Sequence, residues 1–263
     1  MAATIKDIAK KIGKTTTTVS RALNDYDDIS EETKELVRKA AAELGYIPNT
    51  MAQRLQKRQT DTIGLIVPTS GPRFSDPFFS EFIAGIGNTA SRRGYDLLVS
   101  TRAPGDLELE TYRQHIRSHR VDGFIIVRTR HEDERINILR KSGFPFTSFG
   151  RANCELDFPY VDEDGEQGMK LVMEYLAKLG HKHFGVISPP SNLEFSRYRL
   201  KGIWDKAAEL GIAAHDISIL EGDLTQRSGY EITNQLLDQP RFPTAIIACN
   251  DLMAFGAMSA AQE

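Results

Sequence analysis

From Thr62 onward, short apolar runs of strand length alternate with longer stretches of helical character. The runs are nearly continuous in apolar residues, which is typical of strands that are buried on both faces. Strands of this kind, separated by helices, form parallel sheets with helices on both sides, so this part of the chain is predicted to be α/β. The apolar runs comprise residues 63–67, 95–99, 123–127, 145–149, 184–188, 217–220 and 244–248, and the helical stretches comprise residues 78–93, 108–119, 133–141, 165–179, 196–210, 226–237 and 251–261.

Aromatic and charged side chains follow the carboxyl ends of these predicted strands, which is where parallel α/β sheets bind their ligands. Sugars require this combination, because a ring covers the apolar face of a sugar and a planar bidentate group binds paired hydroxyls. The same residue types also occur as helix caps and exposed charges, so the pattern alone leaves both interpretations open. The candidates are Asp76, Phe78, Arg128, Arg151, Arg199 and Asp251.

The N-terminal residues have a different pattern, that of three short amphipathic helices. The first helix is predicted to begin after Thr4 and to end at Gly13. The second begins near Thr15, and the third begins after Ser30 and ends at Gly45. Apolar positions spaced as on one helix face predict a shared core of Ile5, Ile8, Ala9, Ile12, Val19, Ala22, Leu23, Leu36, Val37, Ala40, Ala41 and Leu44.

The second predicted helix begins with four threonines, residues 15–18. Threonine is a poor helix former, but on a DNA-facing helix it offers a hydroxyl and a methyl group to base edges. A helix-turn-helix places the first residues of its second helix in the major groove. The whole chain carries a charge of −3, yet residues 1–60 hold 11 basic and 8 acidic side chains, which suits a phosphate backbone. An ordinary three-helix bundle fits this local pattern about equally well.

Four N-terminal segments resemble the lactose repressor family of bacterial transcription factors. They are residues 4–9, 18–24, 30–33 and 44–49, and the similarity is nearly continuous from residue 3 to residue 60. The chain departs from the family pattern at Lys14-Thr15, where the family has Val-Ser. The resemblance implies base readout by Thr16 and Thr17. The full DNA-contacting set that it implies is Thr4, Thr15, Thr16, Thr17, Thr18, Ser20, Arg21, Asn24, Asn49, Ala52 and Leu55.

Residues 49–57 are predicted to form a short hinge helix. A helix of this length is marginal in water, so away from DNA the segment is expected to be a solvated linker. The resemblance implies that two such helices fold together in the minor groove of an operator. Leu55 then resembles a leucine wedged between base pairs, Ala52 allows close approach of the helices, and Asn49 contacts the backbone and minor groove.

Motifs in the α/β part resemble the effector domain of the same family. They are the segment 76–79, Arg199 followed by Gly202, and the segment 250–256. By this resemblance, Arg199 and Asp251 bind effector hydroxyls from one lobe, and Asp76 and Phe78 face the effector from the other lobe. Residues 128–130 followed by 133–136 resemble a subgroup associated with α-glucosides and related sugars. For Arg130, the alternative to a role in this subgroup motif is a solvated side chain.

The expected architecture is therefore α plus α/β: a three-helix helix-turn-helix head with a hinge helix, followed by a two-lobed, periplasmic-binding-protein-like sensor with parallel sheets. The head is residues 1–48, the hinge and linker are residues 49–60, and the sensor is residues 61–263, with an N-lobe of about 61–158 and a C-lobe of about 159–263. The implied protein is a sugar-controlled transcriptional regulator that acts as a repressor of carbohydrate-utilisation genes. Its partners are an inverted-repeat operator in double-stranded DNA, a small sugar and a second copy of the chain.

Other classes of protein lack their required signals. A sugar-binding transport component needs a signal peptide, and an α/β enzyme needs a nucleotide or acid–base motif, and neither is found. No apolar run reaches the length of a membrane span, and Cys154 and Cys249 form no metal or disulfide pattern, which suits the cytoplasm. His181 and His183 lack a partner at ligand spacing and are expected on the surface, and Asp164 is expected to cap a helix rather than to bind calcium. No cofactor is expected.

The last predicted helix runs to the final residue, Glu263, with no glycine, proline or cationic turn to end it. The C-lobe has only three or four predicted strands, whereas the resemblance implies further crossovers. We therefore expect a C-terminally truncated repressor with a folded head. Its sensor is expected to be unstable, poorly soluble or unable to dimerise normally, because sheet edges and apolar helix faces are left open.

Overall fold

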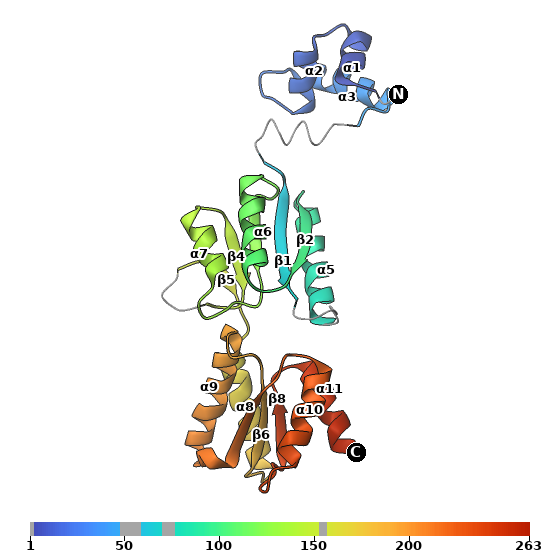
Figure 1. Ribbon diagram of the computed structural model, residues 1–263. Coiled ribbons are helices and arrows are strands. Elements are labelled where there is room, and N and C mark those ends of the chain that lie inside the picture. Colours follow the sequence, from blue (N-terminus) through green and yellow to red (C-terminus); the bar gives the residue numbers. More distant parts are fainter. Residues whose placement is uncertain (1–2, 48–58, 70–76, 153–156) are drawn as a thin grey trace. The chain divides into compact units, whose positions relative to one another are not determined.

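A computed structural model describes residues 3–47, 59–69, 77–152 and 157–263. Contacts divide the chain into two compact units, Met1–Gln59 and Thr60–Glu263, which are described separately below (Figure 1). The first unit is helical and the second contains parallel sheets, so the predicted fold class is confirmed. The finer division into head, hinge and sensor stays a prediction.

The head contains helices α1 (Ile5–Ile12), α2 (Thr16–Leu23) and α3 (Glu31–Glu43). Each begins where the sequence predicts, because the backbone N–H groups of a first turn need side-chain acceptors. The Ser30 hydroxyl accepts a hydrogen bond from the backbone N–H of Thr33 at 3.3 Å. Gly13 follows α1 with a φ of +66°, a left-handed conformation that ends the helix without strain.

The core of the head differs from prediction at one position of α3. Ile8, Val19 and Val37 are fully buried together, as expected. Leu36, however, is 44% exposed, and the predicted core position is wrong. Lys34 is buried instead, at 5% exposure, because its ammonium group lies between two carboxylates that replace its hydration: the carboxylate of Glu31 at 2.8 Å and that of Asp25 at 3.1 Å.

In the described part of the N-lobe, five parallel strands lie in the order β2-β1-β3-β4-β5. Four of them were predicted to within a few residues. The fifth, β5, lies just beyond residue 158, where the N-lobe was predicted to end, and it pairs with β4 of the N-lobe sheet. It was missed because it has only two residues, both exposed, and therefore shows no apolar run. The strands are β1 (Thr62–Pro68), β2 (Asp96–Arg102), β3 (Gly123–Ile126), β4 (Phe146–Phe149) and β5 (Tyr160–Val161).

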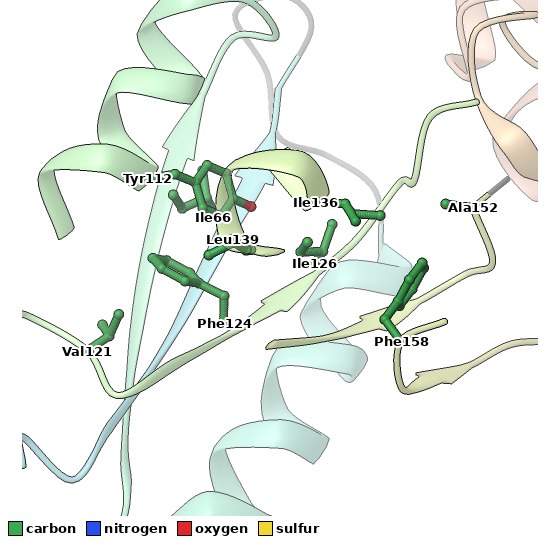
Figure 2. Close-up of a cluster of buried hydrophobic side chains, with 9 residues drawn as sticks. All are labelled: Ile66, Tyr112, Val121, Phe124, Ile126, Ile136, Leu139, Ala152 and Phe158. Carbon is green, nitrogen blue, oxygen red and sulfur yellow. The ribbon is translucent and has the colours of Figure 1, made fainter. Parts of the chain in front are cut away.

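Helices cover both faces of the N-lobe sheet. They are α5 (Pro77–Arg92), α6 (Asp106–Arg117) and α7 (Glu134–Lys141). On one face, Tyr112 of α6 and Leu139 of α7 pack against Phe124 of β3, and Figure 2 shows this cluster of buried side chains. On the other face, Phe79 of α5 packs against Leu65 of β1. Burial from both sides explains why β1 and β3 are apolar along most of their length.

The C-lobe has three parallel strands in its described residues, in the order β7-β6-β8. Their sheet lies between α8 and α9 on one side and α10 and α11 on the other (Figure 1). The elements are α8 (Gly165–Lys178), β6 (Phe184–Ser188), α9 (Glu194–Glu209), β7 (Ile217–Glu221), α10 (Gln226–Leu237), β8 (Ala245–Ala248) and α11 (Asp251–Gln262), with a short 3₁₀ helix at Ala214–Asp216.

Glycines let the paired helices of the C-lobe approach closely. A Cβ atom added to Gly202 of α9 would lie 2.2 Å from the carbonyl oxygen of Glu166 in α8. A Cβ atom added to Gly256 of α11 would lie 2.0 Å from the carbonyl oxygen of Gln226 in α10. Real Cβ atoms do not come this close to backbone oxygens, so both helix pairs depend on the absence of a side chain.

Candidate DNA-binding face and effector site

The four threonines at the start of α2 divide into two pairs with different roles. Thr15 is the N-cap: its hydroxyl accepts a hydrogen bond from the backbone N–H of Thr18 at 3.1 Å and lies 2.9 Å from the Thr18 hydroxyl. Thr16 and Thr17 lie in the first turn with exposed side chains, and the described residues provide no hydrogen-bond partner for either hydroxyl. One pair therefore holds the helix start while the other is free to meet a ligand.

Thr16 and Thr17 border an open hollow of about 520 Å³ on the surface of the head. Ser20 and Arg21 of the same helix line it further along. Ile5 of α1 and Tyr26, which follows α2, complete the wall. This face combines hydroxyl and guanidinium donors with methyl groups and a ring, which are the groups that read base edges.

Arg21 has acidic and aromatic neighbours that sequence reasoning missed. Its Nη2 lies 2.6 Å from a carboxylate oxygen of Asp28, and its guanidinium carbon lies 5.1 Å from the centre of the Tyr26 ring. Both the Arg21 and Asp28 side chains are about half exposed. The cation is therefore held on this face by residues of the following loop rather than extended freely into solvent.

Two other residues of the implied DNA-contacting set hold helix ends. The Asp7 carboxylate accepts hydrogen bonds from the hydroxyl of Thr4 at 2.7 Å and from its backbone N–H at 2.9 Å, and these bonds lower the pKa of Asp7. The Asn24 side-chain amide donates to the carbonyl oxygen of Ser20 at 2.8 Å. Contact of Thr4 and Asn24 with DNA stays a prediction. The hinge residues Asn49, Ala52 and Leu55 lie outside the described residues.

In the N-lobe, the structure brings two of the predicted effector residues close to a group of aromatic rings. Phe78 is 46% exposed at the start of α5, and its ring centre lies 5.6 Å from that of Phe149 at the end of β4. The guanidinium carbon of Arg128 lies 4.9 Å from the ring centre of Phe79, and its Nη1 donates to the carbonyl oxygen of Pro68 at 3.2 Å. The exposed ring of Phe78 and a cation over the adjacent, buried ring of Phe79 are residue types expected at a sugar site.

Arg151 connects the two lobes. Its Nε donates to a carboxylate oxygen of Asp162 at 2.7 Å, and its guanidinium carbon lies 4.0 Å from the ring centre of Tyr198 in α9. Burial alone would lower the pKa of Arg151, but the Asp162 carboxylate outweighs burial and the pKa is raised. The next residue along α9 is Arg199, so Arg151 contacts the residue that directly precedes a second predicted effector residue.

Arg199 and Asp251 both lie at the carboxyl end of the C-lobe sheet. Arg199 donates to the carbonyl oxygen of Cys249 and to the carboxylate of Glu163, and its guanidinium carbon lies 4.7 Å from the Phe195 ring centre. Asp251 is exposed at the first position of α11, two residues beyond Cys249. No direct contact between the two side chains is recorded. Asp76, the remaining predicted effector residue, lies outside the described residues.

A buried ionic cluster at the end of β3 was not predicted. Arg130 is not solvated, since its Nη2 donates to the buried Glu108 carboxylate at 2.7 Å and its side chain is only 16% exposed. Arg135 is fully buried and bonds to both Glu108 and Asp133. The signal in the sequence was a run of charged residues between a buried strand and the next helix, but nothing in a linear pattern indicates that such charges are buried.

The signals set aside in the sequence have local structural explanations. Asp164 caps α8, accepting a hydrogen bond from the backbone N–H of Gln167 at 2.9 Å, as expected. His183 does have a carboxylate neighbour, because its Nδ1 lies 2.9 Å from Asp216. The described residues include no group of three metal-binding side chains and no helix with the length and apolar character needed to cross a membrane.

A helix-turn-helix head with exposed polar groups on its second helix, followed by two parallel α/β lobes, defines a class of protein. That class is the DNA-binding transcriptional regulator with a sensor domain like those of periplasmic binding proteins. Two family descriptions match the chain. "Bacterial regulatory proteins, lacI family" matches residues 4–49, and "Periplasmic binding proteins and sugar binding domain of LacI family" matches residues 60–263.

The chain belongs to the LacI family. It is 34% identical to the HTH-type transcriptional regulator AglR of Rhizobium meliloti (strain 1021), over 99% of this chain and 73% of that protein. It is 35% identical to the HTH-type transcriptional repressor CytR of Escherichia coli (strain K12), over 99% of this chain and 75% of that protein. These relatives are transcriptional regulators rather than enzymes, as the sequence predicts.

Solved structures of the same family match along the full chain. The lac repressor dimer bound to operator and the anti-inducer ONPF gives a TM-score of 0.83 at 28% identity, covering 100% of this chain and 78% of that one. The complex of the transcriptional regulator CelR with cellobiose gives a TM-score of 0.68 at 29% identity, covering 99% of this chain and 78% of that one. The fold predicted from the sequence is therefore confirmed.

Proposed function

We propose that this protein is a repressor of carbohydrate-utilisation genes that acts in the cytoplasm as a homodimer on an inverted-repeat operator. The observation that carries this proposal is the exposed pair Thr16 and Thr17 beside the hollow in the head, with hydroxyls that have no hydrogen-bond partner among the described residues. Thr16 and Thr17 read base edges, and Arg21 adds a cation on the same face. Two heads are required, because one short helix contacts only one half-site of an inverted repeat.

The effector of this repressor is a small sugar bound between the lobes. On the N-lobe side, Phe78 provides an exposed ring and Arg128 a guanidinium group. Arg151 follows β4, and Arg199 of α9 reaches the carboxyl end of the C-lobe sheet, so both add guanidinium groups to the site. Asp251 adds a carboxylate at the start of α11. An α-glucoside fits this set, because the rings cover the apolar face of a pyranose and the charged groups bind its hydroxyls.

The test begins with an operator selected in vitro from randomised inverted repeats and bound to the full chain. Fluorescence anisotropy then measures operator affinity with and without maltose, sucrose and cellobiose as probes. Arg199→Ala and Asp251→Asn should abolish the sugar response and leave operator affinity unchanged. Arg227→Ala is the matched control in the same lobe, because Arg227 is exposed and pairs with Glu231 on its own helix.

Each outcome bears on a different part of the proposal. If selection enriches no inverted repeat, the assignment of a DNA-binding dimer is wrong. If an operator is bound but neither maltose nor sucrose changes its affinity, the α-glucoside assignment is wrong, whether or not the β-linked cellobiose does. If Arg199→Ala or Asp251→Asn responds to sugar as the parent does, that residue does not belong to the effector site.

A further inference from the structure

The buried side chain of Arg135 forms hydrogen bonds with the loop that joins β3 to α7, residues 127–133. The Nε and Nη2 atoms of Arg135 donate to the two carboxylate oxygens of Asp133 at 2.8 and 2.6 Å, and its Nη1 donates to Glu108 at 3.1 Å. The two remaining N–H groups donate to the carbonyl oxygens of Val127 at 3.1 Å and Arg128 at 2.9 Å. All five donors of the guanidinium are therefore used, three on carboxylates and two on the backbone of the loop.

This arrangement sets an unusual backbone conformation at Arg128. Its φ is +50°, which residues other than glycine rarely adopt and which persists only where surrounding contacts impose it. The Arg135 guanidinium holds the carbonyl oxygen of Arg128, and the Asp133 carboxylate accepts from the backbone N–H of Arg130 at 3.0 Å. The backbone of the loop is thus held by hydrogen bonds at Arg128 and again at Arg130.

The opposite side of the same loop contacts the C-lobe. The backbone N–H of Glu194 donates to the carbonyl oxygen of Thr129 at 2.9 Å, and that of His131 donates to Asn192 at 3.3 Å. Arg130 and Leu193 form an antiparallel bridge between these bonds. The Nδ1 atom of His131 also lies 3.0 Å from the carboxylate of Glu194. A short antiparallel pairing therefore joins residues 129–131 of the N-lobe to residues 192–194 of the C-lobe.

The loop also touches a second candidate effector residue. The Thr129 hydroxyl donates to the carbonyl oxygen of Arg151 at 2.5 Å. Gly150 makes this approach possible, since a Cβ atom there would lie 2.7 Å from the Thr129 hydroxyl. One loop thus positions Arg128, supports Arg151 and contacts the other lobe.

We propose that Arg135 is a positioning residue that holds the lobes together and shapes the effector site from the interior of the N-lobe. Its side chain is fully buried and does not reach a ligand. It acts by fixing residues 128–131, so that Arg128 is presented to the effector and the backbone of residues 129–131 pairs with the C-lobe. The role assigned to Arg128 rests on the proposed function, whereas the pairing between the lobes does not.

Hydrogen–deuterium exchange on the full chain, without DNA or sugar, tests this inference. Arg135→Lys keeps the positive charge, but a lysine has three donors and no planar fork. Exchange should accelerate at residues 128–131 and, across the lobe boundary, at residues 192–196, by about ten- to a hundredfold, as expected for losing one or two charge-assisted hydrogen bonds. Exchange in β7 should stay unchanged.

Ile136→Val is the matched control, because the neighbouring Ile136 is equally buried but faces the apolar core of the N-lobe. It should loosen the N-lobe and leave residues 192–196 protected. Glu108→Gln is a milder variant of the cluster, which should give the Arg135→Lys pattern with smaller amplitude even if the lysine variant does not fold.

Two results would overturn the inference. In one, the cluster variants loosen the N-lobe while residues 192–196 keep their protection. In the other, Ile136→Val loosens residues 192–196 as much as the cluster variants do, which would mean that Arg135 only contributes to N-lobe stability. Because no operator or sugar is present, failure of the proposed function would not produce either result.

Discussion

Replacing Thr17 by alanine should weaken operator binding while leaving the head slightly more stable. The Thr17 side chain is exposed in the first turn of α2 and borders the hollow of the head. Alanine has a higher helix propensity than threonine, by up to about 0.7 kcal/mol, so the fold gains from the change. Loss of a base-reading hydroxyl and methyl group should cost about 1–3 kcal/mol on the operator, or roughly 5- to 150-fold in affinity, and almost nothing on random DNA.

Thr15→Ala is the matched control, since Thr15 lies two residues away on the same helix. Its hydroxyl caps α2 by accepting from the Thr18 N–H, so its loss should destabilise the head by about 1 kcal/mol. Thr17→Ala and Thr15→Ala are thus expected to shift head stability in opposite directions.

Two measurements on the full chain decide this prediction. Fluorescence anisotropy compares the selected operator with a scrambled duplex of equal length, and circular dichroism follows thermal unfolding of the head. If Thr17→Ala lowers affinity equally for both duplexes, Thr17 does not read bases. If it destabilises the head as Thr15→Ala does, the division of the four threonines into capping and reading pairs is wrong.

Three further predictions concern other parts of the chain. Gly202→Ala places a Cβ atom 2.2 Å from a backbone oxygen and should destabilise the C-lobe by about 1–3 kcal/mol or more in denaturant unfolding. In the control Gly168→Ala, the new Cβ atom has no neighbour within 4 Å, so this variant should stabilise the C-lobe by about 0.5–1 kcal/mol. Equal effects of the two variants would contradict the close packing of α8 and α9. Asp28→Asn removes the acidic partner of Arg21 and one negative charge near the DNA-binding face. Affinity for random duplex should therefore rise about two- to fivefold at low salt, which corresponds to the interaction energy of an exposed ion pair. An unchanged affinity would show that the pair has no electrostatic influence on binding. Burial alone would raise the pKa of Asp133, but hydrogen bonds and charge from Arg135 outweigh burial and lower the pKa. The stability that Asp133 contributes is therefore complete above the pKa of the unfolded chain and is lost as the pH falls through the lower folded value. Asp133→Asn should reduce the loss of N-lobe stability between neutral pH and pH about 3, and an unaltered acid-unfolding curve would contradict this.

Local features of the sequence predicted much of the fold. Helix ends at Thr15, Ser30 and Gly13 were identified because a cap acts on backbone groups within three or four residues of itself. The buried strands were found because burial on both faces leaves a continuous apolar run in the chain. Where that run is absent, as in β5, the strand was missed, because its pairing with β4 is the only feature that makes it a strand.

The candidate site was predicted in part. The residue types at the strand ends were identified from their positions in the chain, but their partners were not. Arg151 meets the ring of Tyr198, and Arg21 meets Asp28, through contacts that no sequence spacing indicates. Assignment of Arg199 and Asp251 to one effector site stays a prediction, since the structure places both at the end of the C-lobe sheet without joining them directly.

The sequence by itself determined the features that depend on near neighbours: the helix caps, the apolar strands, the threonines at the start of α2 and the family to which the chain belongs. Only the tertiary structure decided which charged groups are buried. In the head, Lys34 is buried, whereas Leu36, which was predicted to lie in the core, is exposed. At the end of β3, the side chain of Arg135 is fully buried and that of Arg130 is mostly buried. The physical reason is that a charge leaves water only when partners replace its hydration, and those partners, Asp25 for Lys34 and Glu108 for both arginines, are brought into place by the fold.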